Sequence, residues 1–450
     1  MDTTKENQKE EKNPEDGAAL SDRFVDIREA KAHGGKAQEK KDGDKPSGGG
    51  TNVHVLTFLL AACSMIGPFA TDMYLPSFHQ MMGEFGVGLA DVQQTLSAYL
   101  IGFAVMTLFY GTISDVLGRK PTMVAGFVLF ALASLGAALS SSLEALIVYR
   151  ACEGVFAGCG MVVGMAVIRD LYGGPQAQKL MAYVAMVFGF GPAMAPIIGG
   201  YLAVHAGWQS HFWVLTVISF ALAALCLFLL PESLPKDKRT PVSLTVLCKG
   251  YARCAAHAPF MLGNVALGLA FLGQGVFIAG AADWCVNVAG LQADQFWMLF
   301  IPMVTGTVVG SWISTRLAVS VGTQQSIRIG FGVMLLAAAV STGYIVFNVE
   351  ARMPWAVVPL SVYTIGIGII RPGMSLMLMD CFSSARGMAS SVLSFVQTLL
   401  FALCSAIVVP ILYGAGWKYD AAIASFALLT IVLWVAGSNL KLRQSRSHWQ

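Results

Sequence analysis

From Val53 onward, the sequence alternates apolar runs of membrane-spanning length with short polar breaks. One bilayer crossing needs roughly 20 mainly apolar residues. Because lipid offers no hydrogen bonds to the backbone, each run is expected to be a helix. We place twelve runs at 53–78, 93–113, 121–139, 143–168, 179–203, 210–230, 259–282, 295–315, 326–347, 354–379, 387–413 and 418–438. The sequence therefore predicts an all-α membrane protein with twelve transmembrane helices.

The distribution of charge points the same way. The first fifty residues hold 10 basic and 12 acidic side chains, so only 33 of the 55 charged residues are left for the other 400 positions. That number is too small to solvate the surface of a soluble protein of this size. A soluble enzyme, a nucleic-acid binder and a disulfide scaffold are all poor interpretations of such a chain.

Motifs for covalent or nucleotide chemistry are missing from the sequence. It contains no GxxxxGK[ST], HExxH or GxSxG pattern, and none of its nine cysteines forms a CxxC pair. We therefore predict that the chain is not an enzyme, that it needs no cofactor and binds no metal, and that an ion gradient supplies its energy.

The polar stretch 231–258 divides the twelve runs into two sets of six. The predicted segments are a disordered cytoplasmic tail at 1–52, a first half at 53–230, a cytoplasmic linker at 231–258, a second half at 259–438 and a cytoplasmic C-terminal tail at 439–450. The two halves also resemble each other, since 111–117 aligns with 311–317 at an offset of 200 residues. Two six-helix pseudo-repeats are typical of proteins whose halves rock about a central site. Within the first tail, residues 21–34 have an alternative as a short surface helix.

Basic residues orient the chain across the membrane. Of the 19 in residues 51–450, 15 lie in connections that share one side, whereas Arg352 and Lys418 lie on the other and Arg150 and Arg371 lie within runs. Cytoplasmic loops carry the excess of Lys and Arg. Both termini are therefore predicted to be cytoplasmic.

Asp72 is the first candidate site residue, because a charge inside a membrane span is costly and needs a reason. Pro68 and Pro76 flank it and interrupt the helical hydrogen bonds, so the backbone there can bend and line a cavity. A carboxylate held away from water could take up and release a proton near neutral pH. The alternative is an acid near the outer end of the run that merely reaches water.

Arg150 and Glu153 lie one helical turn apart in the fourth run and share a face. The guanidinium could face a central cavity and hold the anionic or hydrogen-bond-accepting part of a substrate. The alternative is an internal ion pair that only neutralises its two members.

Two further charged residues are weaker candidates for a cavity. Arg371 lies toward the inner third of the tenth run, where reaching out to the inner interface is the favoured interpretation. Asp283 lies near the outer end of the seventh run, either at a cavity mouth or as an ordinary interfacial acid.

Several motifs resemble those of the major facilitator superfamily, and within it those of Bcr/CflA-type drug:proton antiporters. The loop Gly111–Pro121 resembles the superfamily motif G-x3-D-x2-G-R-[KR], and Arg150 with Gly154 resembles R-x3-G. Thr71–Pro76 and Ile168–Tyr172 suggest the closer family. In the fifth run, the residues similar to the antiporter motif are Gly191, Pro192, Ala195, Pro196, Gly199 and Gly200.

The resemblance implies roles for single residues. It gives Asp72 and Arg150 parts in proton coupling and substrate binding. It also implies a conformational latch formed by Asp115, Gly118, Arg119 and Asp170. In that latch Arg119 pairs with Asp170, and Asp115 faces the N-terminal end of the helix that starts near Gly387.

The sequence departs from the family pattern at two positions that matter. Glu153 stands where related sequences commonly have Gln, which leaves the number of transported protons open. Thr315 leaves the second copy of the loop motif without an acid, so the latch is expected on one side only.

The resemblance implies the major facilitator fold and the export of drug-like small molecules in exchange for protons. The expected location is the bacterial inner membrane, and the expected partners are a small-molecule substrate, protons and the bilayer, with no nucleic acid and no partner subunit. The alternative is a transporter that imports a metabolite or nutrient through the same fold.

Overall fold

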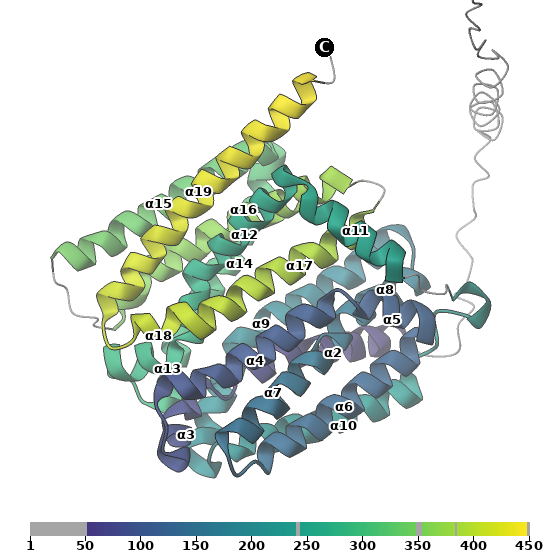
Figure 1. Cartoon of the computed structure of the whole chain (residues 1–450), viewed down its shortest axis with the longest axis horizontal. Coiled ribbons are helices and arrows are strands. Elements are labelled where there is room, and N and C mark those ends of the chain that lie inside the picture. The colour runs from purple at the N-terminus through teal and green to yellow at the C-terminus, as the bar shows by residue number, and fades with distance from the viewer. Residues whose placement is uncertain (1–51, 240–243, 348–352, 383–384, 448–450) are drawn as a thin grey trace, which may run out of the picture. The chain divides into compact units, whose positions relative to one another are not determined.

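A computed structural model describes residues 52–239, 244–347, 353–382 and 385–447, and Figure 1 shows it as a bundle of helices. In these ranges, eleven helical segments are long and apolar enough to cross a bilayer. A twelfth span is formed by α4 (Leu89–Thr107) and α5 (Tyr110–Leu117), which are bent by 54° at the break between them. The predicted count of twelve spans is confirmed.

The first half contains six spans. Span 1 consists of α2 (Val53–Asp72), η1 (Leu75–Ser77) and α3 (Phe78–Phe85), and span 2 of α4 and α5. The others are α6 (Arg119–Ala138), α7 (Leu143–Ala157) with α8 (Cys159–Leu171), α9 (Gly174–Ala206) and α10 (Gln209–Leu229).

The second half contains the other six. Span 7 consists of α12 (Ala258–Ala279), α13 (Ala281–Asp283) and the π-helix η3 (Trp284–Val288), followed by η4 (Ala293–Gln295). Spans 8 to 10 are α14 (Trp297–Ser320), α15 (Thr323–Val346) and α16 (Val358–Met379), which lies between η5 (Trp355–Val357) and η6 (Asp380–Phe382). Span 11 is α17 (Arg386–Leu403), the π-helix η7 (Cys404–Val408) and α18 (Val409–Leu412), and span 12 is α19 (Gly416–Ser447).

The two halves repeat the same packing scheme. In the first half α4 packs on α7, α6 on α10 and α2 on α9; the corresponding pairs in the second half are α14 with α16, α15 with α19, and α12 with α17. Figure 1 shows the purple and blue helices of the first half grouped apart from the green and yellow helices of the second. The weak sequence repeat thus corresponds to a repeated arrangement of helices.

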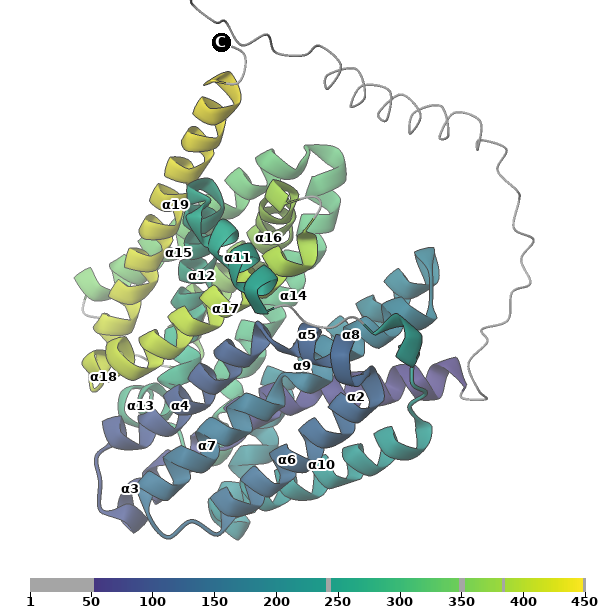
Figure 2. The same cartoon turned by 45° about the vertical axis from the view of Figure 1, so that its right-hand side comes forward.

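The segment that joins the halves, predicted as a linker, contains helical structure. Within 231–258 the chain forms η2 (Lys236–Lys238) and α11 (Leu244–Ala256), and α11 packs on α12 and α17 of the second half. Its Tyr251 hydroxyl also donates a 2.5 Å hydrogen bond to the carbonyl of Leu108, in the break between α4 and α5. In Figures 1 and 2, α11 extends from the second half toward α5.

Both terminal segments were predicted to be cytoplasmic tails. The prediction for 1–52 falls outside the described residues except for Asn52, whose side chain accepts a 2.9 Å hydrogen bond from His54 N and caps α2. The predicted last span, 418–438, agrees with the apolar segment Gly416–Leu440, and α19 continues beyond it to Ser447. Helix geometry persists there because no Gly or Pro follows Gly437 in that helix.

Hydrogen bonds join the halves near the span ends that the predicted topology places outside, which we call the outer ends. Gln93 of α4 donates a 2.7 Å bond to Ser405 Oγ of η7 and accepts a 3.1 Å bond from the Tyr413 hydroxyl. Ser97, one turn after Gln93, donates to Ser405 Oγ at 3.1 Å. The outer ends of spans 2 and 11 are therefore in contact through neutral groups.

Two glycines of α9 allow close approach at the same outer level. A Cβ on Gly199 would overlap the backbone carbonyl of Met73, and one on Gly200 would overlap the carbonyl of Ala293 in η4. Residues without side chains let backbones approach each other closely in membranes. The predicted motif in span 5 therefore packs α9 against both the end of α2 and the second half.

Candidate functional site

Arg150 and Glu153 form an ion pair inside the first half. Both side chains are fully buried, and Arg150 Nη1 pairs with Glu153 Oε2. Arg150 Nη2 donates a 2.9 Å hydrogen bond to the carbonyl of Ala70, and the Ser134 hydroxyl donates a 2.5 Å bond to Glu153 Oε1. Of the two alternatives that the sequence left open, the structure shows the internal ion pair.

Three aromatic rings surround the guanidinium of Arg150. Its Cζ lies 4.4 Å from the ring centre of Tyr74, 4.5 Å from that of Tyr99 and 5.7 Å from that of Phe212. These rings come from spans 1, 2 and 6, and such contacts are strongest where water is excluded. Arg150 therefore joins four helices of the first half. Of its side-chain nitrogens, Nε has no hydrogen bond to a described residue.

Asp72 is the last residue of α2 and lies close to this cluster. Its side chain is 3% exposed, and Ala70, two residues earlier, accepts the hydrogen bond from Arg150. The α-helix ends after Asp72, and the chain continues through Met73 and Tyr74 into η1. Among the described residues, no Lys, Arg or His forms a salt bridge with Asp72. Asp72 is thus a buried carboxylate without a salt bridge, and it lies next to a pair that is already neutral.

The predicted pair of Arg119 and Asp170 is confirmed at the inner end of the first half. Arg119 Nε lies 2.9 Å from Asp170 Oδ2, and Arg119 Nη1 lies 2.6 Å from Asp115 Oδ1. Gly118, with φ +100°, makes the turn between α5 and α6. In this structure Asp115 pairs with Arg119, and its predicted placement at the start of α17 stays a prediction.

The linker contributes to the same cluster. Glu232 Oε1 accepts a 3.0 Å hydrogen bond from Arg119 N, and the Ser233 hydroxyl donates a 3.0 Å bond to Asp170 Oδ2. Sequence reasoning missed both residues, because they lie in the polar stretch far from the loop motif. The acidic residue directly after Pro231 was the available signal.

The comparisons with known proteins match this architecture. A family model described as "Major Facilitator Superfamily" matches residues 60–405. The chain belongs to the major facilitator superfamily.

Two relatives of this transporter carry names of drug resistance and multidrug transport. It is 30% identical over 287 residues to a "Bicyclomycin resistance protein homolog" of Haemophilus influenzae, covering 64% of this chain and 72% of that protein. It is 26% identical over 334 residues to "Multidrug transporter MdfA" of Yersinia pestis, covering 74% and 81%. The chain is therefore a multi-pass membrane transporter and not an enzyme, as predicted.

A solved structure confirms the fold. The "D-xylose-proton symporter" matches with a TM-score of 0.67 over 84% of this chain and 97% of that one, at 15% identity. At that identity the likeness supports the twelve-helix major facilitator fold and nothing about substrate.

Asp283 of the transporter does not lie open at a cavity mouth. It is 1% exposed and accepts hydrogen bonds from the Tyr419 hydroxyl at 3.0 Å, from Gly414 N at 3.0 Å and from Asn287 Nδ2 at 2.8 Å. Both sequence interpretations placed it in contact with water, and both were wrong. Chain segments distant in sequence bury it, so Asp283 joins spans 7, 11 and 12.

Arg371 does not reach toward the inner interface. Its Cζ lies 6.0 Å from the ring centre of Phe271 in α12. At 1.5 Å per residue, Phe271 lies roughly 20 Å from the inner end of α12, whereas Arg371 lies roughly 12 Å from the inner end of α16. The side chain therefore points toward the helix N-terminus and away from the inner surface, as side chains on a helix tend to do. The favoured interpretation from the sequence was wrong.

Sequence reasoning also missed polar residues that carry no charge or lie at helix ends. Gln93 and Ser97 share a face of α4, and this spacing was the signal available for a contact between the halves. Asp420 of α19 lies beside Ser341 of α15 and is partly buried.

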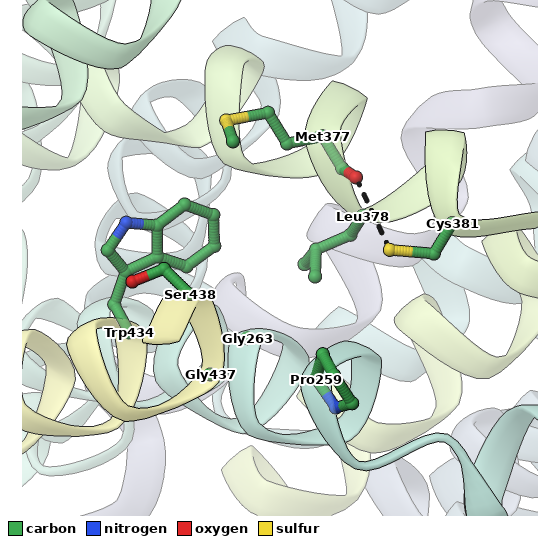
Figure 3. A pocket seen from close by; sticks show the side chains of 8 residues that line it. All are labelled: Pro259, Gly263, Met377, Leu378, Cys381, Trp434, Gly437 and Ser438. Atoms are coloured by element: carbon green, nitrogen blue, oxygen red, sulfur yellow. Dashed lines mark hydrogen bonds between the residues drawn. The ribbon is translucent and has the colours of Figure 1, made fainter. Parts of the chain in front are cut away.

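Two cavities in the described part of the chain lie away from these residues. One of about 40 Å³ lies between α12, α16 and α19. Figure 3 shows mainly apolar side chains around it, and the Cys381 thiol donates a hydrogen bond to the Met377 carbonyl. The other, of about 540 Å³, is lined by α14, η5 and the start of α16. Neither is lined by Asp72, Arg150 or Arg371, so neither cavity belongs to the candidate site.

Proposed function

We propose that this transporter exports drug-like small molecules in exchange for protons by alternating access. The observation that carries the proposal is Asp72, a buried carboxylate that forms no salt bridge within the described residues and sits where the first span breaks. A group of this kind can bind a proton when the outer side is open and release it when substrate arrives from inside. Competition between proton and substrate is sufficient to couple their movements.

The break after Asp72 supports the same mechanism. Gly199 of the antiporter motif packs on the carbonyl of Met73, directly after the carboxylate. A movement of α9 against the end of α2 would therefore act on the surroundings of Asp72. The contact of Gln93 with Ser405 would open in the outward state, and the Arg119 cluster would rearrange with it.

A proton-flux measurement tests the role of Asp72. In reconstituted vesicles, Asp72→Asn is expected to abolish the proton movement that a transported drug induces, because the amide cannot exchange a proton. Asp420→Asn is the matched control, since it removes another partly buried acid from a span and should retain the movement. Unchanged proton movement in Asp72→Asn would contradict the proposal.

The direction of transport needs its own test. The bicyclomycin resistance homologue and the multidrug transporter favour export over import of a nutrient. Cells that express the chain should survive higher concentrations of drugs from a test panel, and cells that express Asp72→Asn should not. Higher accumulation of the compound in expressing cells would instead support import.

The proposed location is the inner membrane of a bacterium, with both termini in the cytoplasm. The 15 basic residues on one side of the predicted topology support this orientation. A tag at the C-terminus should be protected from protease in spheroplasts and should become sensitive only after lysis. Cleavage in intact spheroplasts would reverse the topology.

A further inference from the structure

Arg371 differs from the other cations in the part of the chain that the structure describes. It lies at least eight residues from either end of α16, its side chain is exposed, and no carboxylate of the described residues forms a salt bridge with it. A guanidinium in a span that faces lipid without a partner is costly. Its exposed position therefore requires either water or a ligand with complementary charge.

The neighbours of Arg371 face the inside of the transporter. Phe271, whose ring the guanidinium lies over, packs edge-to-face on Phe401 of α17 with ring centres 5.3 Å apart. The helix α17 in turn packs on α4 of the first half. On its other sides α16 packs on α14 and α15. Arg371 thus lies on the side of α16 that leads to the contact between the halves.

The same region offers an aromatic surface and an amide. Phe271 is only partly buried, and Gln397 of α17 lies beside Gly268, one turn before Phe271. The Gln397 amide nitrogen donates a weak 3.4 Å hydrogen bond to Asn264 Oδ1. The side-chain oxygen of Gln397 has no hydrogen bond to a described residue. A guanidinium binds a carboxylate through two parallel hydrogen bonds, and an aromatic ring binds the flat body of a ligand.

Arg150 cannot supply this binding. Its Nη1 and Nη2 are bonded to Glu153 and Ala70, and aromatic rings cover its guanidinium. The carboxylate Asp72 would repel an anion in any case. Recognition of a negative group therefore falls to the second half of the chain.

We propose that Arg371 is the specificity-determining residue of this transporter and that it binds the carboxylate of an aromatic substrate whose ring lies against Phe271. The substrate class is therefore an aromatic carboxylate, or a zwitterion whose cationic end lies toward Asp72. This inference rests on the proposed function, because it assigns a substrate class to the proposed exporter.

The test uses two dyes that differ only at the carboxylate. Rhodamine 110 carries a free carboxylate, and rhodamine 123 is its methyl ester. Binding of each dye to the purified full-length protein is followed by fluorescence anisotropy, without any proton gradient. Wild-type protein should bind rhodamine 110 about tenfold or more tightly than rhodamine 123, because a hydrogen-bonded charge pair contributes on that scale.

Substitutions at Arg371 should change this preference and nothing else. Arg371→Gln should weaken binding of rhodamine 110 about tenfold and leave rhodamine 123 within about twofold. Arg371→Glu should reverse the preference. Arg316→Gln is the matched control, since Arg316 also stacks on an aromatic ring, that of Trp312 at 5.2 Å, and lies at the inner end of α14. It should keep the wild-type preference.

Several outcomes would overturn the proposal. These are equal binding of both dyes by wild type, an equal loss of both dyes in Arg371→Gln, or a preference for rhodamine 110 that survives in Arg371→Glu. If Arg371→Gln does not fold, folded Arg371→Lys must keep the preference, since it keeps the charge, and its loss would count against the inference.

Failure of the proposed function would look different. If no dye moves protons in vesicles but the binding preference depends on Arg371, antiport is wrong and the substrate class stands. If rhodamine 123 moves protons through Asp72 while Arg371→Gln changes nothing, antiport stands and the substrate class is wrong.

Discussion

Among the described residues, each half of this transporter holds one arginine at least seven residues from either end of its span, and the two have opposite surroundings. Arg150 in the first half is fully buried, paired with Glu153 and covered by three aromatic rings. Arg371 in the second half is exposed, lies 6.0 Å from the ring centre of Phe271 and forms no salt bridge with a described residue. The first arginine stabilises its half, and the second is accessible to a ligand.

The difference extends to the rest of each half. The first half also holds its inner end through Arg119 with Asp115 and Asp170. In the second half, the ion pair of Arg386 with Asp380 is exposed, and neutral hydrogen bonds join the buried parts of the helices, such as Tyr363 to the carbonyl of Ala270 at 3.0 Å. Pseudo-repeats of one architecture can therefore be stabilised by different interactions, and a charge that is not needed for stability can serve binding.

The strongest test of the comparison is stability. Arg150→Met should destabilise the protein by about 3–5 kcal/mol, because it leaves Glu153 buried without its partner. Arg371→Met should change stability by no more than about 0.5 kcal/mol, as expected at an exposed position. Thermal unfolding of both purified variants in detergent measures the difference. Replacing Glu153 by Met as well should restore much of the loss, and equal effects of the two arginines would break the comparison.

The inner ends of the halves should differ in transport rate. Arg119→Ala should slow turnover about tenfold while substrate binding persists, because the bonds to Asp115 and Asp170 are lost in one state of the cycle. Arg316 lies in the second copy of the loop motif, at 311–317, and Arg316→Ala should leave turnover near that of wild type. Transport and dye-binding assays on the same preparations separate the two effects. Loss of binding in Arg119→Ala would argue against a latch.

The contact between the halves depends on neutral groups, so its loss should change the conformation and not the charge balance. Gln93→Ala removes the bonds to Ser405 and Tyr413 and should favour the outward-open state by about 1–3 kcal/mol. Spin labels at the outer ends of spans 2 and 11 should report a longer distance. Gln94→Ala, which removes only 3.3 Å bonds, is the control. An unchanged distance in Gln93→Ala would show that this contact does not hold the outer side closed.

The smallest effect is expected for a single neutral bond in the second half. Tyr363→Phe removes the hydrogen bond to Ala270 and should cost about 0.5–1.5 kcal/mol. Thermal unfolding beside Arg150→Met ranks the two kinds of interaction. A loss as large as that of Arg150→Met would show that the second half relies on polar contacts as strongly as the first.

The sequence predicted the parts of the site that depend on local spacing. Residues three apart on a helix share a face, so Arg150 and Glu153 were placed on one face, with an internal ion pair as one of two alternatives. The pair of Arg119 with Asp170 was implied by the resemblance to the major facilitator superfamily. Contacts among distant segments could not be predicted in this way, and Glu232, Ser405 and Tyr413 were missed because a neutral or loop residue has no signal in composition.

The sequence by itself determined the number of spans, their division into halves and the short set of charged residues within them. It could do so because the bilayer requires about 20 apolar residues per crossing and makes each exception costly. Only the tertiary structure decided that Asp283 is buried by Tyr419 and Gly414, and that Arg371 lies over Phe271. The direction and surroundings of a side chain depend on which helices pack beside it, and that packing joins residues a hundred or more positions apart.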